Sequence, residues 1–377
     1  MKNSITFAAL DTHKKEHKVA VVYPDTGELE EFTVRNNIKD VTQMARRVAK
    51  KAPGPVKFCY EAGVCGFTLQ RWIQATGCQC GVIAPSLIPV KPGDRIKTDR
   101  RDARKLVRLF MADQLTEVHA PDLQQEAARE LTRCRQAAQE SLIRARHQLL
   151  KLLDRHGYLY TEGAHWTSRH RAWLTALKFD QTYVQAAYDN YLTEVEHCTE
   201  RVESLDKQVE ALAASEPYQA AVGLLRCFRG IGTLTAICLL TEIFEFGRFD
   251  SPRALMAYLG IVPSQDASGS DTKDRRLPIT RTGNGRVRRL LVEAATHYRH
   301  GSGVSAAMKK RRVGQPAWAL ALADRATGRL RRRHAYLIQR GKHRCKVTVA
   351  VARELAGFIW AMLREYQQHQ AQAAVKG

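Results

Sequence analysis

The sequence lacks the features of a membrane protein, a disulfide-linked protein or an ATP-driven enzyme. No apolar run reaches the roughly 18 residues that a membrane-spanning helix needs. The nine cysteines are scattered, and Cys78 and Cys80 have no second pair at the spacing of a zinc site. No Gly-x-x-x-x-Gly-Lys-Ser/Thr loop occurs. Met1-Lys2-Asn3-Ser4 leads directly into an apolar run instead of a signal peptide, so we predict a cytoplasmic protein with reduced thiols and no membrane partner.

Acidic residues are scarce relative to basic ones. The 377-residue chain has 60 Lys and Arg against 38 Asp and Glu, which gives a formal net charge of +22. Most of the excess lies between Ser270 and Lys346, where 21 Lys and Arg accompany only four acidic residues. Such an uneven segment is typical of a surface that binds nucleic acid or another polyanion. The length and a hydrophobic content of 44% predict two or three packed domains.

The first part of the chain, residues 1–120, is predicted to be a mixed α/β domain. Short apolar runs alternate there with helical patterns, which is typical of a sheet covered by helices. The segment Lys97-Thr98-Asp99-Arg100-Arg101-Asp102-Ala103 opens one of these helices, since an apolar period follows it. The expected strands are 5–10, 18–23, 31–34, 56–60 and 81–84, and the expected helices include 41–48 and 67–75.

Four acidic residues stand where the sites of such domains collect. Asp11 and Glu61 each come just past the end of an expected strand. Asp99 and Asp102 are three residues apart, so their carboxylates share one face of a helix. A divalent cation would relieve the repulsion among them, and oxygen ligands suit Mg²⁺ or Mn²⁺, which activate phosphodiesters. The alternative for Asp99 and Asp102 is structural, since acids stabilise the first turn of a helix.

The middle of the chain, residues 121–216, has the heptad pattern of two long helices. Apolar residues recur every seven positions from Leu131 to Leu152 and again from Val195 to Val209. The two seams can pack against each other within one chain or against a second copy. We favour the second arrangement, a coiled coil that dimerises the protein.

The last part, residues 217–377, is predicted to be mostly helical with basic loops. Gly230-Ile231-Gly232 between two helical patterns is similar to a helix–hairpin–helix turn, in which glycines and a helix N-terminus bind phosphate. We expect an Arg-rich linker over 327–346, a final helix over 347–363 and a frayed end over 367–377. The expected nucleic-acid contacts are Gly230, Gly232, Arg275, Arg276, Arg281, Arg286, Arg288 and Arg289.

In combination these motifs resemble the DEDD-type insertion-sequence transposases, the bridge-RNA-guided recombinases. The resemblance covers nearly the whole chain and implies an RNase H/RuvC-like domain, a coiled-coil linker and a helical transposase domain. The matching segments, in order, are Leu10-Asp11-Thr12-His13-Lys14, Tyr60-Glu61-Ala62-Gly63, Lys97-Thr98-Asp99-x-x-Asp102-Ala103, Gly230-Ile231-Gly232, Ala257-Tyr258-x-Gly260-x-x-Pro263 and Ser268-Gly269-Ser270.

The resemblance also implies the chemistry. It makes Asp11, Glu61, Asp99 and Asp102 the metal ligands and Ser268 the nucleophile, with Ser270 as the neighbour that could replace it. A structured guide RNA would pair with donor and target DNA, and the protein would read shape and backbone. The protein would act as a homo-oligomer, a dimer or a tetramer, in association with a bacterial nucleoid.

Two other classes of function stay open. One is a metal-dependent junction-resolving nuclease, in which the carboxylates activate water and Ser268 takes no part. The other is a nucleic-acid scaffold without catalytic activity.

Overall fold

The computed structural model describes residues 4–89, 99–264, 278–301 and 303–376, apart from the side chains of residues 99–100 and 373–376. These residues fall into two compact units, Met1–Asp122 and Leu123–Gly377. In the described part of the chain, no helix combines the length and the apolar character that a membrane crossing requires. All nine cysteines are free thiols.

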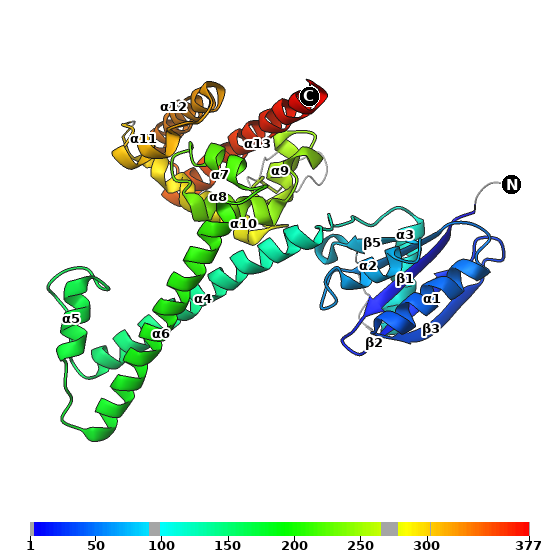
Figure 1. Ribbon diagram of the computed structural model, residues 1–377, viewed down its shortest axis with the longest axis horizontal. Helices are drawn as coiled ribbons and strands as arrows, with labels where there is room; N and C mark the ends of the chain where they lie inside the picture. The colour runs from blue at the N-terminus through cyan, green and yellow to red at the C-terminus, as the bar shows by residue number, and fades with distance from the viewer. Residues whose placement is uncertain (1–3, 90–98, 265–277, 302, 377) are drawn as a thin grey trace. The chain divides into compact units, whose positions relative to one another are not determined.

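A five-stranded mixed sheet forms the centre of the first unit (Figure 1), with the strand order β3-β2-β1-β4-β5. β2 lies antiparallel to β1 and to β3, whereas β4 and β5 continue the sheet in parallel with β1. A short turn suffices for the antiparallel pairs, and each parallel pair has a helical connection. The strands are β1 (Thr6–Thr12), β2 (Glu16–Val22), β3 (Leu29–Arg35), β4 (Val56–Glu61) and β5 (Gln79–Ile83). The predicted mixed α/β domain is thereby confirmed.

Helices cover both faces of this sheet. α1 (Ile38–Lys51) and α2 (Thr68–Gln74) pack on one face, where their apolar side chains share a core with Leu10 and Tyr60. α3 (Asp99–Met111) packs on the other face and shares a smaller core with Ala9 and Cys59. Successive strand residues therefore alternate between the two faces.

The second unit begins with a long helical hairpin made by α4 (Leu123–Arg155) and α6 (Thr182–Ala213), with α5 (Ser168–Ala176) between them in sequence (Figure 1). The two heptad seams are buried against each other in one hydrophobic cluster. The seam that could have paired with a second copy is thus used within the chain. Self-association stays a prediction, and it would use other faces of these helices.

The rest of the second unit is a helical body, as predicted. Its core joins the base of the hairpin to the following helices, and α13 packs against α9, α10 and α12. The helices are α7 (Gln219–Leu225), α8 (Thr233–Ile243), α9 (Pro252–Tyr258), α10 (Gly285–Thr296), α11 (Ala306–Arg312), α12 (Ala317–Gln339) and α13 (Arg344–Lys376), with 3-10 turns η1 (Pro85–Leu87, in the first unit), η2 (Phe246–Arg248) and η3 (His297–Arg299).

Two predictions for the end of the chain are wrong. The expected linker over 327–346 is largely helix, because α12 continues to Gln339 with its buried residues Leu322, Ala326 and Leu330 at helical spacing. The expected frayed end over 367–377 is helical to Lys376. Glutamine and alanine, which dominate that end, are good helix formers and extend a helix that is already anchored in the core.

Candidate functional site

The ends of two neighbouring strands place Asp11 and Glu61 next to each other. Leu10 pairs with Tyr60 in the parallel register of β1 and β4, so Asp11 and Glu61 occupy the next position of each strand. Adjacent strands lie about 4.8 Å apart. Both acids are still within their strands, and not just past them as predicted.

The two carboxylates belong to the same face of the sheet. Ala9 and Cys59, two positions before Asp11 and Glu61, are buried in the core beneath α3. Side chains two positions apart on a strand point to the same side. Asp11 and Glu61 therefore project on the face that α3 covers.

The helix α3 brings Asp102 to this end of the sheet. The rings of Phe7 in β1 and Phe110 in α3 stack edge to face, with centroids 5.4 Å apart. From Phe7 to Asp11 the strand advances about 13 Å, and from Phe110 back to Asp102 the helix covers about 12 Å. Since Ala103 is buried in the same core as Ala9 and Cys59, α3 extends from Phe110 back toward the end of β1 that carries Asp11, and its first turn holds Asp102.

Two of the four predicted ligands, Asp11 and Glu61, thus occupy neighbouring strand ends, and α3 with Asp102 packs on the same face of the sheet. Carboxylate oxygens fit a divalent cation chemically. The side chain of Asp99, which opens α3, lies outside the described residues. Among the side chains that are described, no group of three or more His, Cys, Asp or Glu stands close enough to hold an ion. The complete ligand set stays a prediction.

His13 adds a side chain to this site. Its Nε2 lies 3.2 Å from Oδ2 of Asp11, whose side chain is 22% exposed. The sequence analysis included His13 only as part of a motif. Its place two residues after the acid, at the end of the same strand, was the available signal.

In the second unit, a short antiparallel stem encloses the segment that carries the predicted nucleophile. Pro263 and Ile279 form a bridge, and the amide of Ser264 donates to the carbonyl of Pro278 over 3.0 Å. Both strands of the stem therefore have fixed positions where they leave the helical body. The predicted residues Ser268, Ser270, Arg275 and Arg276 lie in 265–277, outside the described residues.

Two glycines allow this stem to pack against the end of α9. Gly283 has a φ of +70°, and a Cβ there would lie 1.8 Å from the carbonyl oxygen of Tyr258. Gly260 has a φ of +62°, and its Cβ would lie 2.2 Å from the carbonyl oxygen of Thr282. No side chain fits at either position, so the glycines fix how the stem meets the helix.

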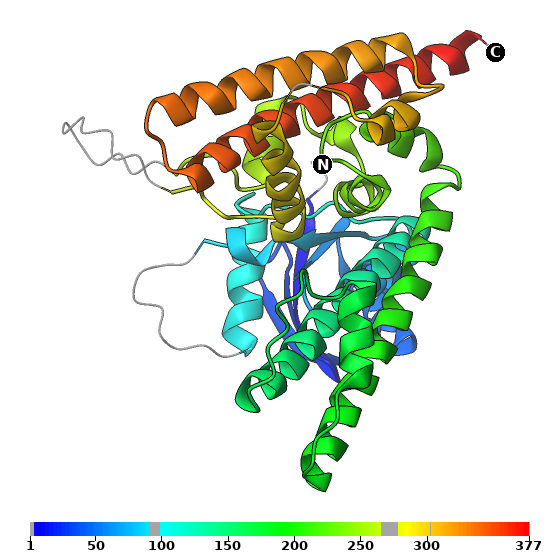
Figure 2. The ribbon, with the colours of Figure 1, turned by 90° about the vertical axis from the view of Figure 1, so that its left-hand side faces the viewer.

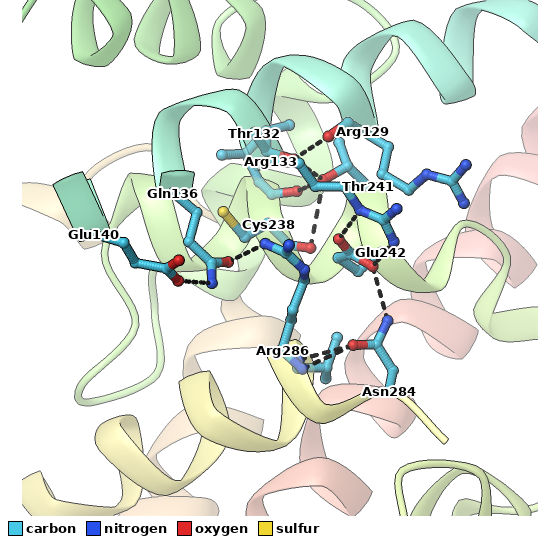
Figure 3. Close-up of polar contacts among 12 residues, drawn as sticks. Arg129, Thr132, Arg133, Gln136, Glu140, Cys238, Thr241, Glu242, Asn284 and Arg286 are labelled. Carbon is cyan, nitrogen blue, oxygen red and sulfur yellow. Dashed lines mark hydrogen bonds and ion pairs between the residues drawn. The ribbon is translucent and has the colours of Figure 1, made fainter. Parts of the chain in front are cut away.

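Near the start of α10, Glu242 of α8 contacts residues of α4 and the N-cap of α10 (Figure 3). Its carboxylate accepts hydrogen bonds from Nε and Nη2 of Arg133 in α4, over 2.7 and 2.9 Å. It also accepts one from Nδ2 of Asn284 over 2.8 Å. Asn284 in turn caps α10, because its Oδ1 accepts from the amides of Arg286 and Val287.

Glu242 is only 6% exposed but remains a carboxylate. Burial by itself would raise its pKa, but the hydrogen bonds from Arg133 and Asn284 outweigh burial, and the pKa is lowered. Glu242 was missed by the sequence analysis. The signal was present, since an acid in the apolar run 232–243 needs a buried partner.

The predicted arginine contacts differ in how far they are available to a ligand. Arg286 donates through Nη1 to Gln136 over 2.5 Å. Arg288 donates through Nη1 to two backbone carbonyls, over 2.8 and 3.0 Å. Arg281 and Arg289 are exposed, although Arg289 lies within 4 Å of two glutamates. Arg281 and Arg289 are therefore the contacts of this group that are best placed to reach phosphate.

The glycine turn before α8 has a packing role. Gly230 has a φ of +79°, and a Cβ there would lie 2.4 Å from the carbonyl oxygen of Ala294 in α10. Gly232 caps α8 and has open space around its Cβ position. The phosphate contact at this turn stays a prediction. Of the two glycines, only Gly232 has open space beside its backbone where a phosphate could bind.

Comparison with known families assigns both units. Residues 8–157 match the model of the IS110-type DEDD domain, which is described as transposase. Residues 222–309 match the model described as transposase of the IS116/IS110/IS902 family.

Individual relatives extend over almost the whole chain. The candidate transposase y4qE of Sinorhizobium fredii is 39% identical over 365 residues, which cover 96% of this chain and 89% of the relative. The transposase for insertion sequence element IS1533 of Leptospira borgpetersenii is 33% identical over 342 residues, which cover 88% of this chain and 96% of the relative. The transposase for insertion sequence element IS1111A of Coxiella burnetii is 24% identical over 284 residues, or 74% of this chain and 69% of the relative.

Proposed function

The chain belongs to the IS116/IS110/IS902 family of transposases, and on this premise we propose that it joins DNA strands by serine attack beside a carboxylate-bound divalent cation, guided by a structured RNA. Family membership makes it a DNA transposase of an insertion sequence. The observation that supports the proposed chemistry is that Asp11 and Glu61 lie at neighbouring strand ends, on the face of the sheet that α3, the helix of Asp102, covers.

The carboxylates would hold Mg²⁺ or Mn²⁺, with Asp99 as the fourth ligand. A bound ion supplies positive charge that stabilises the extra negative charge on a phosphodiester during attack. The residues of the first unit would set the geometry, since β1, β4 and α3 would each contribute a separate part of the ligand set. His13, which contacts Asp11, is placed to hold or pass a proton at this carboxylate.

Ser268 would be the nucleophile. Its Oγ forms a bond to phosphorus while the bond from phosphorus to one deoxyribose oxygen breaks. The serine proton passes to a base, and the released deoxyribose oxygen takes up a proton. The phosphoserine ester keeps the energy of the broken bond, so religation needs no ATP. In the proposed dimer or tetramer, the carboxylates of one protomer act beside Ser268 of another.

The test compares strand cleavage and adduct formation in Ser268→Ala, Ser270→Ala and Asp102→Asn, with Asp25→Asn as an exposed acidic control. We expect Ser268→Ala and Asp102→Asn to lose cleavage, and Ser270→Ala and Asp25→Asn to retain it. A protein–DNA adduct that maps to the peptide with Ser268 would support the covalent step. Retained cleavage in Ser268→Ala would favour the nuclease with activated water. Absence of cleavage in the wild type, with nucleic-acid binding that Asp102→Asn leaves unchanged, would favour the scaffold.

The proposed partners are donor DNA, target DNA and a guide RNA. The polyanion binding that all three require agrees with the net charge of +22. The RNA is tested by copurification: nuclease-protected RNA should copurify with the protein, and its sequence should match the non-coding end of the insertion element. Protein purified without RNA that still selects the same target site would exclude guidance.

A further inference from the structure

A strongly basic segment near the end of the chain lies outside both family matches. Residues 325–353 contain ten Lys and Arg and no Asp or Glu. The matched regions, 8–157 and 222–309, do not reach this segment. It forms the second half of α12, the turn to α13 and the start of α13, and Figure 2 shows these two helices lying side by side. Neither the carboxylate site nor the serine stem accounts for its charge.

Some of these arginines serve the fold. Nε of Arg329 donates to Glu354 over 2.9 Å, and Nε of Arg333 lies 3.2 Å from the same carboxylate. Nε of Arg331 donates to the carbonyl of His300 over 3.0 Å. These three arginines connect α12 to α13 and to the preceding segment, so part of their hydrogen-bonding capacity is already used within the protein.

The remaining cations gather at the end of the helical pair, which we call the α12–α13 tip: Arg332, Tyr336, Arg340, Lys342, Arg344 and Lys346. Its five cations are exposed, as is every residue from Ile338 to Lys346. Among the described side chains, no carboxylate lies within ion-pair distance of any of them. No described carboxylate compensates their mutual repulsion, which favours binding of an external anion.

The tip also carries an exposed aromatic ring. Arg332, Tyr336 and Arg340 are each four residues apart, so they share one face of α12. Tyr336 is 46% exposed, and the guanidinium of Arg340 lies 5.3 Å from the centre of its ring. An exposed ring among cations is the combination that stacks an unpaired base while the cations bind the phosphates.

We propose that the α12–α13 tip binds single-stranded nucleic acid, with phosphates at Arg332, Arg340, Lys342 and Arg344 and a base stacked on Tyr336. The residues of this site are different from those of the serine stem and from the carboxylates. It rests on the proposed function only in that both require a nucleic-acid partner. Single-stranded DNA and single-stranded RNA offer the same phosphates and bases, and the experiment distinguishes them.

The test measures binding of the full chain to fluorescent single-stranded DNA, single-stranded RNA and duplex DNA of equal length, by anisotropy at several salt concentrations. The variant Arg340→Gln/Lys342→Gln/Arg344→Gln removes three tip cations. Each phosphate contact with a single strand contributes a log–log salt slope of about −0.7, so three contacts correspond to a loss on the order of 100-fold at about 0.1 M salt. The control Lys39→Gln/Lys50→Gln/Lys207→Gln removes the same charge from exposed positions elsewhere and should lose far less.

A second variant isolates the aromatic ring. Tyr336→Ala should weaken single-strand binding by about 5- to 100-fold without a change in salt slope, and should leave duplex affinity unchanged. A loss for RNA alone would identify RNA as the partner, and equal losses for RNA and DNA would identify single strands in general. An unchanged salt slope in the tip variant, or an equal loss in the control, would overturn the proposal.

Two further measurements distinguish a loss of tip binding from unfolding and from a failure of the proposed metal chemistry. Thermal unfolding should be unchanged in the tip variant, because every substituted position is exposed. Asp102→Asn should bind single strands with the wild-type salt slope whether or not it cleaves DNA. If the proposed metal chemistry is wrong, binding of single strands to the tip should still be observed. If the tip does not bind single strands, strand cleavage measured at saturating protein should be unchanged in the tip variant.

Discussion

Replacement of Glu242 by Gln should destabilise the C-terminal unit far more than its conservative nature suggests. The substitution keeps the shape of the side chain but removes the charge that Arg133 pairs with. The amide nitrogen of Gln also cannot accept from Asn284, so the cap of α10 loses a contact. The two effects act on the same junction of α4, α8 and α10 (Figure 3).

The expected size follows from how buried each partner is. Loss of one partner of a buried ion pair costs about 3–5 kcal/mol in the free energy of unfolding. The side chain of Glu242 is 4% exposed, whereas that of Arg133 is 36% exposed, so water stabilises part of the unpaired charge. We therefore expect a loss of about 2–3 kcal/mol. For a unit of this size, that loss lowers Tm by about 5–10 °C.

The pH dependence has a definite sign. The pKa of Glu242 in the folded chain lies below its ordinary value of 4.5. Its contribution to stability is therefore fully present above about pH 5 and is lost as the pH falls through the folded-state pKa. The difference in stability between the wild type and Glu242→Gln should therefore shrink as the pH falls through the folded-state pKa, because protonation removes the same charge as the substitution.

Thermal unfolding followed by circular dichroism, at neutral pH and at about pH 3, measures both effects. Glu140→Gln is the control, since Glu140 is exposed and lies 3.9 Å from Arg289. It should change the free energy of unfolding by less than about 0.5 kcal/mol. Equal Tm values for Glu242→Gln and the control, or a gap that persists undiminished in acid, would refute the reasoning.

Two other predictions concern the glycine turn and the cation. Gly230→Ala should lower Tm in thermal unfolding, because φ is +79° there and the new Cβ would lie 2.4 Å from the carbonyl oxygen of Ala294. Gly301→Ala is the control, since its Cβ would have open space and Tm should not change. Equal Tm values for the two variants would contradict the packing role of Gly230. Removal of divalent cations with a chelator should abolish strand cleavage but leave DNA affinity in gel shifts unchanged, since carboxylates and basic residues are separate groups. Loss of binding on chelation would speak against this separation.

The sheet of the first unit could be predicted because its strands carry the information locally. Apolar runs that end at Asp11 and Glu61 indicate both the strand and the position of its polar end. The pairing of β1 with β4 is not encoded in either strand alone, but parallel strands with a helical connection usually lie next to each other. The neighbouring positions of Asp11 and Glu61 at two strand ends therefore followed from elements of this kind. Whether the carboxylates form a complete ligand set depends on side-chain positions, which the sequence pattern does not specify.

The helical unit was harder because its decisive contacts join distant segments. Thr132 and Arg133 contact Thr241 and Glu242 across 109 positions of the chain, and no local pattern links these pairs. The heptad seams indicated packing but not the partner, and the partner is the same chain. The second half of α12 falls in the predicted linker over 327–346 because its many arginines obscure an apolar period of only a few residues.

The basic side chains of the second unit differ in whether they are paired within the protein. Arg133, Arg288 and Arg329 are each engaged by a carboxylate or by backbone carbonyls, so they stabilise the fold. Substituting them would weaken DNA binding through unfolding, and a scan by alanine would wrongly score them as contacts. Exposed cations that have no carboxylate partner among the described side chains, such as Arg340 and Lys342, can be removed without this cost. The pairing of each arginine, more than its place in a basic run, therefore separates the residues that hold this unit together from those free to bind phosphate.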